Sequence, residues 1–596
     1  IPEGLPIVSI IALTYGMLRM AKKNVLIKKL ASVETLGGIT TIFTDKTGTL
    51  TENKIEVNCL VLLDETIQVS NGEKKFEADK KNEKVLEKLF LISTLCNNAN
   101  ESLEGTEENY IGDAIEISML QFAISNKIDT KDMNTAYPRI AEQPFNSETK
   151  MMATLHKNNG NNFVAAKGAV EEIIKKCISY YSVDSAISLT DDIRNIFLKK
   201  ALEIQELGLK VLAFAFKEGD NIDPKNLTTE LTLAGLIGFL DPPRLEVIGA
   251  LQSCRDAGIK VIMITGDHPA TALNIAKQVN LSGSDDIVIT NKELQTHLSD
   301  EKLFAATVFA RVTPKQKLDM VSLYQKRGDI VAMTGDGIND APALKKADIG
   351  IAMGIRGTQV AKETADMVLK DDSFNSIIAA IMQGRVIFKN IKNFVVYLLS
   401  CNLSEIFIVF LYGLFNFHFS ILPLQILFLN LVTDIFPALA LGLGKGNDLI
   451  MKLPPRNPQQ GILVKTDWLT ITIYAVLIAA PIMLITWYCS YQLNYKAAVC
   501  NNITFFSLTF AQLWHVLNLS SRKVSFFKNE ITRNLYNWGA LLLCIVIVAV
   551  FYFISPLNTY IDLQKLSSTT WLIIAVTSII PVVLIQFLKR VIKVLD

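Results

Sequence analysis

Two loops of this sequence carry residues suited to phosphoryl transfer. The first, Asp45-Lys-Thr-Gly-Thr-Leu-Thr51, sets a carboxylate among small and hydroxyl residues, and the second, Thr334-Gly-Asp-Gly-Ile-Asn-Asp340, adds Asp336. A carboxylate can act as nucleophile toward phosphorus, loop amides such as those of residues 47–49 can hold phosphate oxygens, and Mg²⁺ prefers oxygen ligands. The residue types predict Asp45 as nucleophile, Lys46 and Lys317 as compensating charges, and a Mg²⁺ ion shared by Asp45 and Asp336. The chain contains no GxxxxGK[ST] pattern, which excludes a P-loop.

The elements expected to position these loops are short apolar strands that end in aspartate. Strands over 39–43, 260–264 and 329–333 lead to Asp45, Asp267 and Asp336, and a further strand is expected over 348–353. Helices are expected over 245–257, 270–279 and 314–326. Alternating strands and helices predict a doubly wound parallel sheet. Ligands of such sheets bind beyond the carboxyl ends of the strands, so the three aspartates are expected to share one cleft.

A second domain is expected as an insertion into the first. Between residues 53 and 224 the sequence is more polar and rich in lysine. We therefore expect a phosphoryl-transfer domain over 21–52 and 225–385 that is interrupted by an α+β domain over 53–224.

The composition indicates a protein that lies partly in a membrane. Of the 596 residues, 50% are hydrophobic and 20% are charged, and mean hydropathy is +0.30, which is too apolar for an ordinary soluble enzyme and excludes disorder. The formal net charge of +1 excludes nucleic-acid binding driven by overall charge. Apolar runs near the length of a membrane-spanning helix follow at 394–415, 421–443, 468–488, 503–519, 538–554 and 571–588. We expect six spans over 386–596, and a further partial span over 1–20.

The basic residues of the connections alternate between the two sides of these spans. One set of connections holds Lys389, Lys392, Lys445, Lys452, Arg456, Lys465, Arg522, Lys523, Lys528, Arg533, Lys589, Arg590 and Lys593, whereas the other holds only His418, Lys496 and Lys565. Basic connections stay in the cytosol. The sequence therefore predicts a multi-pass membrane protein whose large polar part is cytosolic, with a lipid bilayer as a partner.

Taken together, the motifs resemble those of the P-type cation-transporting ATPases. The resemblance rests on Asp45-Lys-Thr-Gly-Thr49, Thr265-Gly-Asp267, Thr334–Asp340 and Pro2-Glu-Gly-Leu-Pro6, and it runs over nearly the whole chain. It implies a haloacid-dehalogenase-like phosphorylation domain in which ATP phosphorylates Asp45. It also implies that Asp241-Pro-Pro-Arg244 lies beside the hinge.

The same resemblance assigns roles around Asp45. The Thr47 backbone and Asp336 would bind Mg²⁺ together with Asp45. Lys317 and the Thr265-Gly266-Asp267 motif would contact the transferred phosphate. Asn339 and Asp340 would order the site.

The inserted domain would then bind the nucleotide. The residues that match the family pattern, or stand where related pumps carry a basic residue, are Glu116, Phe145, Lys150, Lys167, Gly168, Lys210 and Arg311. Phe145 can stack on adenine, and the lysines suit a polyanion. Val170 stands where proline is common in the family.

Ionisable residues within membrane spans indicate a cation site. Glu3, Glu405 and Asp434 are accompanied by Asn402, Asn430 and Thr433, which gives a set of oxygen ligands that suits calcium. Polar bonding between helices is the plainer alternative. The set is similar to that of the sarcoplasmic-reticulum-type calcium pumps. Gln512 departs from this set, because the two-site pumps tend to have Glu at that position. The plasma-membrane calcium pumps resemble this sequence there. Whether one or two calcium ions are carried per cycle is therefore left open by the sequence.

Two further features bear on function. The Thr-Gly-Glu-Ser loop of the family's actuator domain does not occur, and the chain begins within an apolar run, so we expect a fragment that lacks the first spans and the actuator. Cys489 and Cys500 flank an outward loop, either as a disulfide or as two thiols. The leading hypothesis is an ATP-driven calcium pump without an obligate protein partner. The alternatives are a sodium, proton or manganese pump, and a non-transporting nucleotide-binding membrane protein.

Overall fold

The computed structural model divides the chain into two compact units. The first comprises Ile1–Ile42, Gln252–Lys260 and Leu318–Asp596, and the second comprises Phe43–Leu251 and Val261–Lys317. The residues that the structure describes are 4–52, 54–69, 82–101, 110–146, 149–158, 160–182, 185–220, 222–283, 287–295, 299–418, 420–457, 460–520, 526 and 529–591. Glu3 lies outside them.

In the second unit, the inserted domain is built on a nine-stranded mixed sheet. The strand order is β11 (Ser185–Ser188), β10 (Cys177–Ser182), β13 (Leu231–Leu240), β12 (Lys210–Gly219), β9 (Asn161–Ala169), β8 (Met151–Asn158) and β7 (Arg139–Asn146), with β3 (Glu56–Val61) on β13 and β4 (Thr66–Gln68) on β3. The sheet continues past the predicted boundary at 224, because β13 pairs with β12 and β3. β13 is apolar at nearly every position, so its sequence lacks the alternation of polar and apolar residues found in a half-buried strand. Its sequence therefore did not show which of the two domains the strand belongs to.

Helices cover both faces of this sheet, because successive strand residues point to opposite faces and both sets of side chains are apolar. Ala213 and Ala215 face the core that α6 (Val170–Lys176) and α7 (Asp191–Glu206) cover. Phe214 and Phe216 face the core that α3 (Glu83–Leu95) and α4 (Ala114–Ser125) cover. The insertion is therefore an α+β domain, as predicted. Its remaining described elements are β5 (Asn100–Glu101), β6 (Tyr110–Ile111) and α5 (Thr130–Ala136).

Parallel strands occur in both units; three of them lie at or near the runs predicted over 260–264, 329–333 and 348–353, whereas the strands over 288–290, 308–310 and 367–369 were not predicted. In the first unit, β17 (Val331–Gly335), β18 (Ile349–Met353) and β19 (Met367–Leu369) are parallel, and β1 (Val25–Ile27) pairs antiparallel with β19. In the second unit, β16 (Val308–Ala310) lies parallel to both β14 (Lys260–Ile264) and β15 (Val288–Thr290). β2 covers Thr41–Thr44. The intervening helices are α2 (Leu30–Leu36), α8 (Glu246–Asp256), α9 (Pro269–Gln278), α10 (Asn291–Leu294), α11 (Asp300–Ala305), α12 (Pro314–Arg327), α13 (Ala341–Lys346) and α14 (Gln359–Thr364). The predicted α/β character is confirmed.

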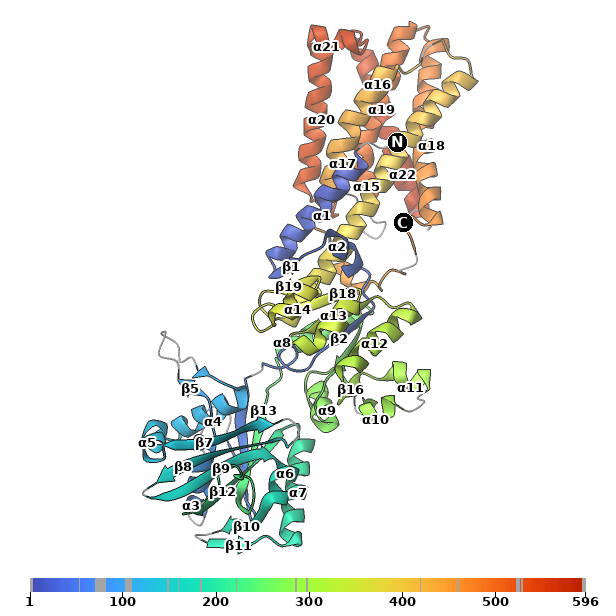
Figure 1. Ribbon diagram of the computed structural model, residues 1–596. Helices are drawn as coiled ribbons and strands as arrows, with labels where there is room; N and C mark the ends of the chain where they lie inside the picture. The colour runs from blue at the N-terminus through green and yellow to red at the C-terminus, as the bar shows by residue number, and fades with distance from the viewer. Residues whose placement is uncertain are drawn as a thin grey trace. The chain divides into compact units, whose positions relative to one another are not determined.

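The first unit also holds a bundle of long apolar helices (Figure 1). Among the described residues, five are long and apolar enough to cross a membrane, namely α15 (Phe374–Leu414), the run Pro423–Gly442 made of α16 (Pro423–Leu429), a π-helical turn (Asn430–Asp434) and α17 (Ile435–Gly442), α18 (Lys465–Tyr491), α20 (Leu535–Phe553) and α22 (Ser568–Val591). They confirm five of the six predicted spans. Shorter helices are α1 (Leu5–Ala21) and α21 (Ser555–Tyr560). α15 begins at Phe374, before the boundary at 386 that was expected for the membrane part.

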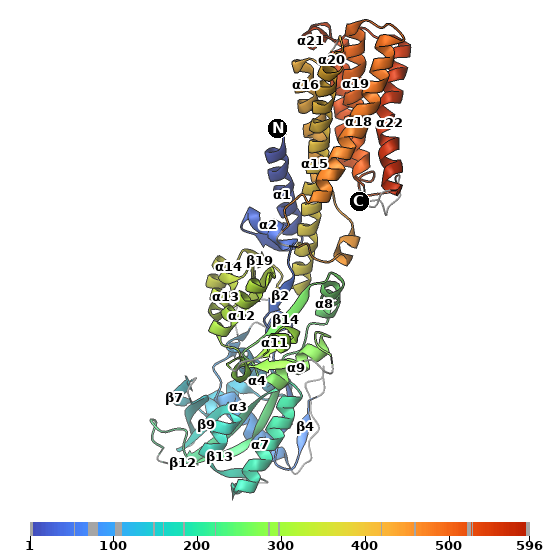
Figure 2. The same cartoon turned by 90° about the vertical axis from the view of Figure 1, so that its right-hand side faces the viewer.

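The sixth predicted span forms a helix but is not one of these five. It corresponds to α19 (Ala497–His515) and the 3₁₀ turn Val516–Leu519, whose buried residues include Asn502, Thr504 and Gln512. α19 packs against α18 and α22, and both views show these three helices side by side (Figures 1 and 2). A helix that is surrounded by others can carry polar residues, because its neighbours satisfy them: Thr504 lies within hydrogen-bond distance of the hydroxyls of Thr486 and Tyr412.

All eight cysteines are free thiols, so the structure gives Cys489 and Cys500 as two unpaired residues.

Candidate functional site

Asp45 follows the fully buried strand β2 and is held by two donors. The Lys46 amide donates to Asp45 Oδ1 over 2.7 Å, and Lys317 Nζ lies 2.6 Å from Asp45 Oδ2. The Lys317 side chain is 8% exposed and that of Asp45 is 17% exposed. A carboxylate that keeps limited access to solvent and is paired with a buried ammonium is suited to meet an anionic reactant, because the cation offsets the added negative charge.

The loop after Asp45 is a tight turn built for backbone approach. Gly48 has φ of 72°, a conformation that favours glycine, and its amide donates to Thr51 Oγ1 over 3.1 Å. The Leu50 amide donates to the Lys46 carbonyl over 3.1 Å. Thr47 lies half-buried within this turn.

A second loop of the same unit is tied to the Asp45 loop by an ion pair. Lys46 Nζ lies 2.5 Å from Asp267 Oδ2. The Asp267 amide donates to Thr265 Oγ1 over 3.2 Å, which orders the Thr265-Gly266-Asp267 turn at the end of β14. Arg311 has a left-handed backbone with φ of 55°, and its amide donates to the Asp267 carbonyl over 3.0 Å. The structure thus places Arg311 beside this turn, after β16, and not in the inserted domain that holds the other nucleotide candidates.

The acidic loop of the first unit is ordered by its own residues. Asp340 is buried, and its Oδ2 accepts the Gly337 amide over 3.2 Å. A Cβ added to Gly335 would come within 2.5 Å of the Asp340 Cβ, so only glycine fits at the end of β17. The Asp336 carbonyl accepts the Thr358 amide over 2.7 Å, while Asn339 is exposed.

The Asp241-Pro-Pro-Arg244 segment clamps the end of the Asp45 loop. Thr51 Oγ1 donates to Asp241 Oδ2 over 2.6 Å, and Arg244 Nε donates to the Thr51 carbonyl over 3.0 Å. Thr51 also forms a β-bridge with Pro243. Both chain crossings between the inserted domain and the phosphoryl-transfer part pass through this clamp, and the sequence pattern alone did not indicate that Thr51 takes part in it.

Most nucleotide candidates gather at one end of β7, β8, β9 and β12. Lys167 Nζ lies 2.6 Å from Glu116 Oε1, and both side chains are largely buried. Gly168 pairs with Met151, and a Cβ there would come within 2.5 Å of the Lys150 carbonyl, so the two chains approach closely only because residue 168 is glycine. Lys150 has φ of 54°.

The two remaining candidates present exposed side chains at this end of the sheet. Phe145 is 63% exposed near the end of β7, close in sequence to Asn146, which pairs with Met151. Lys210 is exposed at the first position of β12, two residues before Leu212, which pairs with Ala169. An exposed phenylalanine beside lysines offers a surface on which a purine can stack while basic groups meet a phosphate chain.

In the helix bundle, hydrogen bonds bring the predicted cation ligands together from three helices. Asn402 Nδ2 donates to Asp434 Oδ2 over 2.8 Å, and Gln512 Nε2 donates to Glu405 Oε1 over 3.0 Å. Thr433 Oγ1 lies 3.1 Å from Gln512 Oε1, which links the two pairs. Glu405 and Asp434 are 5% and 3% exposed.

The backbone of this site departs from α-helical geometry. Asn430–Asp434 form a π-helical turn, a feature that is frequent at functional sites. Pro437 has no amide to donate to the Thr433 carbonyl four residues earlier, and the Tyr397 hydroxyl donates to that carbonyl over 2.7 Å instead. Tyr397 was not predicted; the signal available was a tyrosine within an apolar run, whose hydroxyl needs a partner when buried.

Two buried oxygens of this site accept no hydrogen bond among the described residues, namely Asn430 Oδ1 and Asp434 Oδ1. The described residues contain no group of three or more His, Cys, Asp or Glu that could hold a metal ion. A cation bound here would therefore be held by two carboxylates together with neutral amide, hydroxyl and carbonyl oxygens, which is a ligand set that Ca²⁺ accepts.

Comparison with known proteins decides the family. The sequence is 35% identical over 611 aligned residues to calcium-transporting ATPase 1 of Bacillus cereus, a match that covers 99% of this chain and 67% of the relative. It is 36% identical to the calcium-transporting ATPase of Bacillus subtilis, over 98% of this chain and 67% of the relative. The chain belongs to the P-type cation-transporting ATPases.

Three family profiles match successive parts of this P-type ATPase. They are described as P-type ATPase cytoplasmic domain N (residues 85–246), haloacid dehalogenase-like hydrolase (317–381) and cation transporting ATPase C-terminus (418–591). Domain N includes the nucleotide candidates Glu116 to Lys210, and the hydrolase match includes Lys317 and Asp336. The predicted haloacid-dehalogenase-like class and multi-pass membrane protein with cytosolic catalytic domains are confirmed. The chain spans about two thirds of the length of these relatives.

Proposed function

We propose that this P-type ATPase transports calcium by way of an aspartyl phosphate on Asp45. The observation that carries the proposal is the setting of Asp45, with Lys317 Nζ 2.6 Å from one carboxylate oxygen and the Lys46 amide on the other. A carboxylate oxygen attacks the γ-phosphorus of ATP, the new bond joins this oxygen to phosphorus, and the bond from phosphorus to the β,γ-bridging oxygen breaks to release ADP.

The loops around Asp45 would meet the transferred phosphoryl group. Lys317 offsets negative charge on its oxygens, and the amides of the Asp45–Thr51 turn offer donors. Asp267 holds Lys46 through the 2.5 Å ion pair, which orients the turn. Thr265 and Gly266 would present a hydroxyl and an amide to the phosphate. Asn339 and Asp340 would keep the acidic loop in shape.

Asp45, the Thr47 carbonyl and Asp336 each offer oxygen ligands, which is the donor chemistry that Mg²⁺ prefers, and these residues would hold the ion. When bound, Mg²⁺ neutralises the phosphate charge that develops during transfer.

Domain N would deliver the nucleotide. Phe145 stacks on the adenine, and Lys150, Lys167 and Lys210 attract the phosphate chain. Gly168 leaves the backbone open for close approach, and Glu116 fixes the position of Lys167. Arg311 lies beside the Asp267 turn and would meet the phosphate end of the nucleotide and not its base.

The transported ion would bind where Asn402, Glu405, Asn430, Thr433, Asp434 and Gln512 converge, with Glu3 as a further candidate ligand. The two buried carboxylates of Glu405 and Asp434, and the Asn430 and Asp434 oxygens that accept no hydrogen bond among the described residues, support a divalent cation. The relatives' names as calcium-transporting ATPases favour calcium over sodium, protons or manganese.

Acid-stable labelling by γ-³²P-ATP tests the proposal. The purified chain would be incubated with calcium, with sodium, with manganese and with a chelator, alongside Asp45→Asn and the matched surface variant Asp192→Asn, whose parent residue is exposed on α7. We expect hydroxylamine-sensitive label that depends on calcium, is lost in Asp45→Asn and persists in Asp192→Asn.

Other outcomes would contradict parts of the proposal. If labelling depended on another cation and not on calcium, that cation would be the transported ion in place of calcium. Label that survives in Asp45→Asn would exclude the nucleophile. No label under any cation, with ATP still bound, would favour a non-transporting nucleotide-binding membrane protein.

A further inference from the structure

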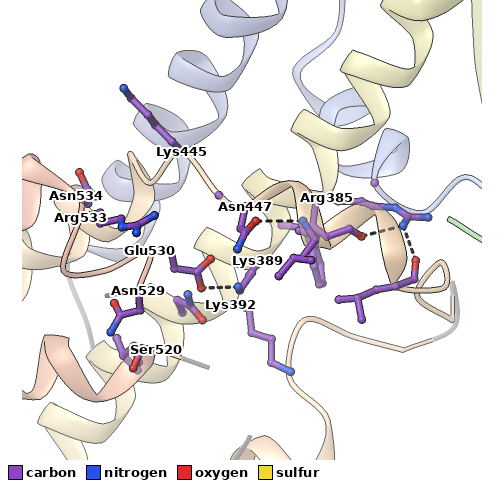
Figure 3. Close-up of a pocket in the computed structure, with 18 of the residues that line it drawn as sticks. Arg385, Lys389, Lys392, Lys445, Asn447, Ser520, Asn529, Glu530, Arg533 and Asn534 are labelled. Atoms are coloured by element: carbon purple, nitrogen blue, oxygen red, sulfur yellow. Dashed lines mark hydrogen bonds and ion pairs between the residues drawn. The ribbon is translucent and has the colours of Figure 1, made fainter. Parts of the chain in front are cut away.

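A large basic cavity lies at one end of the helix bundle in the first unit (Figure 3). Its volume is about 1210 Å³. Residues at the ends of three membrane spans line the cavity. Gly446 follows the span Pro423–Gly442, Leu535 is the first residue of α20, and Lys589 lies near the end of α22. The cavity therefore sits where the spans emerge, on the side that the lysine- and arginine-rich connections mark as cytosolic.

The described residues that line this cavity are strongly unbalanced in charge. Seven basic side chains face a single acidic one, Glu530; the basic residues are Arg385, Lys389, Lys392, Lys445, Arg456, Arg533 and Lys589. They come from segments far apart in the sequence, so their meeting is a product of the fold and not of one basic run. A concave basic surface focuses a positive potential and attracts anions.

Carboxylates within the protein offset only part of this charge. The ion pairs are Lys389 with Glu530, Lys392 Nζ with Asp467 Oδ1 at 2.9 Å, and Arg456 Nη2 with Glu34 Oε1 at 3.2 Å. Lys445 and Arg533 are exposed and make no ion pair among the described residues. These two side chains are therefore available to a ligand.

Arg385 adds a positive charge that is buried but bound to neutral groups. It is 7% exposed, and its guanidinium donates to the carbonyls of Leu453 over 2.6 Å, Ala257 over 3.1 Å and Ile450 over 3.2 Å. Figure 3 shows Arg385 among the residues that line the cavity. Its Nε has no acceptor among the described residues. Carbonyl oxygens satisfy donors without cancelling charge, so the wall of the cavity keeps a net positive field.

Apolar side chains as well as basic ones are exposed along the lining of the cavity. Leu449, Leu453, Leu535 and Tyr536 line it and are exposed, Leu535 by 83%. A soluble anion gains nothing from these apolar side chains, whereas a lipid has acyl chains that would cover them. Anionic lipids enrich the cytosolic face of membranes and attract basic residues at that surface.

We propose that this cavity binds the anionic phosphate headgroup of a phospholipid from the cytosolic leaflet, with Lys445 and Arg533 as its first contacts. Lys445 follows α17, which continues directly from the π-helical turn of the cation candidates, and Arg385 lies on α15, which carries Asn402 and Glu405. A lipid bound here would touch both segments that bear these residues. The inference does not rest on phosphorylation of Asp45, because its test measures lipid binding and not ATP use.

Native mass spectrometry of the purified chain in neutral detergent tests this proposal. The probes are phosphatidylglycerol and phosphatidylcholine with identical acyl chains, added at equal concentration. Because a basic residue near a membrane surface contributes on the order of a fivefold affinity for anionic lipid, we expect the wild-type chain to prefer phosphatidylglycerol and the Lys445→Gln/Arg533→Gln variant to lose roughly tenfold or more of that preference. Both replaced side chains are exposed, so folding is retained.

The matched control is Lys22→Gln/Lys23→Gln, which removes the same charge from exposed residues after α1 that do not line the cavity. We expect it to keep the wild-type preference. An equal loss in this control would show general surface attraction and overturn the proposal. Glycerol 3-phosphate, which is the headgroup phosphate without acyl chains, forms the last arm: displacement of the lipid at similar concentrations would identify a free-anion site and overturn the lipid assignment.

Discussion

Lys317 Nζ lies 2.6 Å from Asp45 Oδ2, although the two residues are 272 positions apart in the chain. The whole inserted domain and three further strands lie between them in sequence. The contact holds the Lys317 ammonium, which α12 carries, at the end of β2. The Lys317 side chain is 8% exposed there. An ammonium held at this place before any reactant arrives needs little reorganisation when negative charge accumulates there.

Replacing Lys317 by Met is expected to slow the proposed phosphorylation of the chain. Removing one charge donor from a phosphoryl-transfer site costs roughly 10²- to 10³-fold in rate, whereas Lys317→Arg should retain part of the activity. Rapid-quench labelling with γ-³²P-ATP measures the rate. Lys326→Met, an exposed lysine of the same helix, is the control. Equal rates for Lys317→Met and the control would remove Lys317 from the proposed chemistry.

The Lys167–Glu116 ion pair predicts a stability effect in domain N. Its atoms are 2.6 Å apart, and the side chains are 9% and 12% exposed. Lys167→Met would leave the Glu116 carboxylate buried and unpaired, which costs about 3–5 kcal/mol in unfolding free energy. The double variant Lys167→Met/Glu116→Gln should recover most of this loss, because no charge stays buried.

Hydrogen exchange of β8 and β9 in the full chain measures this effect. Glu218→Gln is the comparison: it breaks the exposed Lys88–Glu218 pair, whose contribution is about 0–1 kcal/mol. If Lys167→Met cost no more than Glu218→Gln, the pair would not stabilise the domain.

The apolar runs predicted some of the parallel strands closely but not β15, β16 or β19, and they did not predict the order of the inserted sheet. β14 and β18 occupy the predicted 260–264 and 348–353 nearly residue for residue, because buried parallel strands are continuous apolar runs bounded by turns. The order of the nine strands depends on pairings such as β3 with β13. Such partners, 175 to 184 residues apart in these two strands, are chosen by which faces pack together, and no local pattern encodes that choice.

The cation candidates show the same division between local and long-range information. Helical spacing placed Asn402 and Glu405 on one face of α15, as the structure has them. The sequence did not show that Asp434 bonds to the first and Gln512 to the second, or that residues 430–434 form a π-helical turn. Those features depend on how helices pack and on the missing amide of Pro437. Glu3 lies outside the described residues, so its role stays a prediction.

His156 predicts a pH dependence of domain N. Burial lowers its pKa below the ordinary value, as does the neighbouring Arg139, while the hydrogen bond to the Tyr137 carbonyl (2.9 Å) opposes them. The unfolded chain, whose histidines titrate near pH 6.5, therefore takes up this proton before the folded chain as pH falls. The stability of domain N should be fully present above about pH 6.5 and decline below it.

Pulse proteolysis in urea between pH 5 and pH 7.5 measures this decline in the full chain. His156→Gln, which carries no titrating ring, should flatten the profile in this range. His418→Gln, which changes a histidine outside domain N, should leave the decline intact. A decline that persists unchanged in His156→Gln would assign the pH dependence to another group.

Gln512→Glu tests whether the bundle holds a divalent cation. Gln512 is fully buried and donates to Glu405 Oε1 over 3.0 Å, so a carboxylate there would face Glu405 without a hydrogen-bond donor between them. Two carboxylates at this distance repel one another unless a cation or a proton lies between them. We therefore expect the variant to unfold more readily than the wild type in a chelator, and to gain more stability when calcium is added.

Gln512→Met removes the hydrogen bond without adding charge, and should lose stability in the chelator without that gain. If calcium stabilised Gln512→Glu no more than Gln512→Met, the proposed cation would not bind beside Glu405.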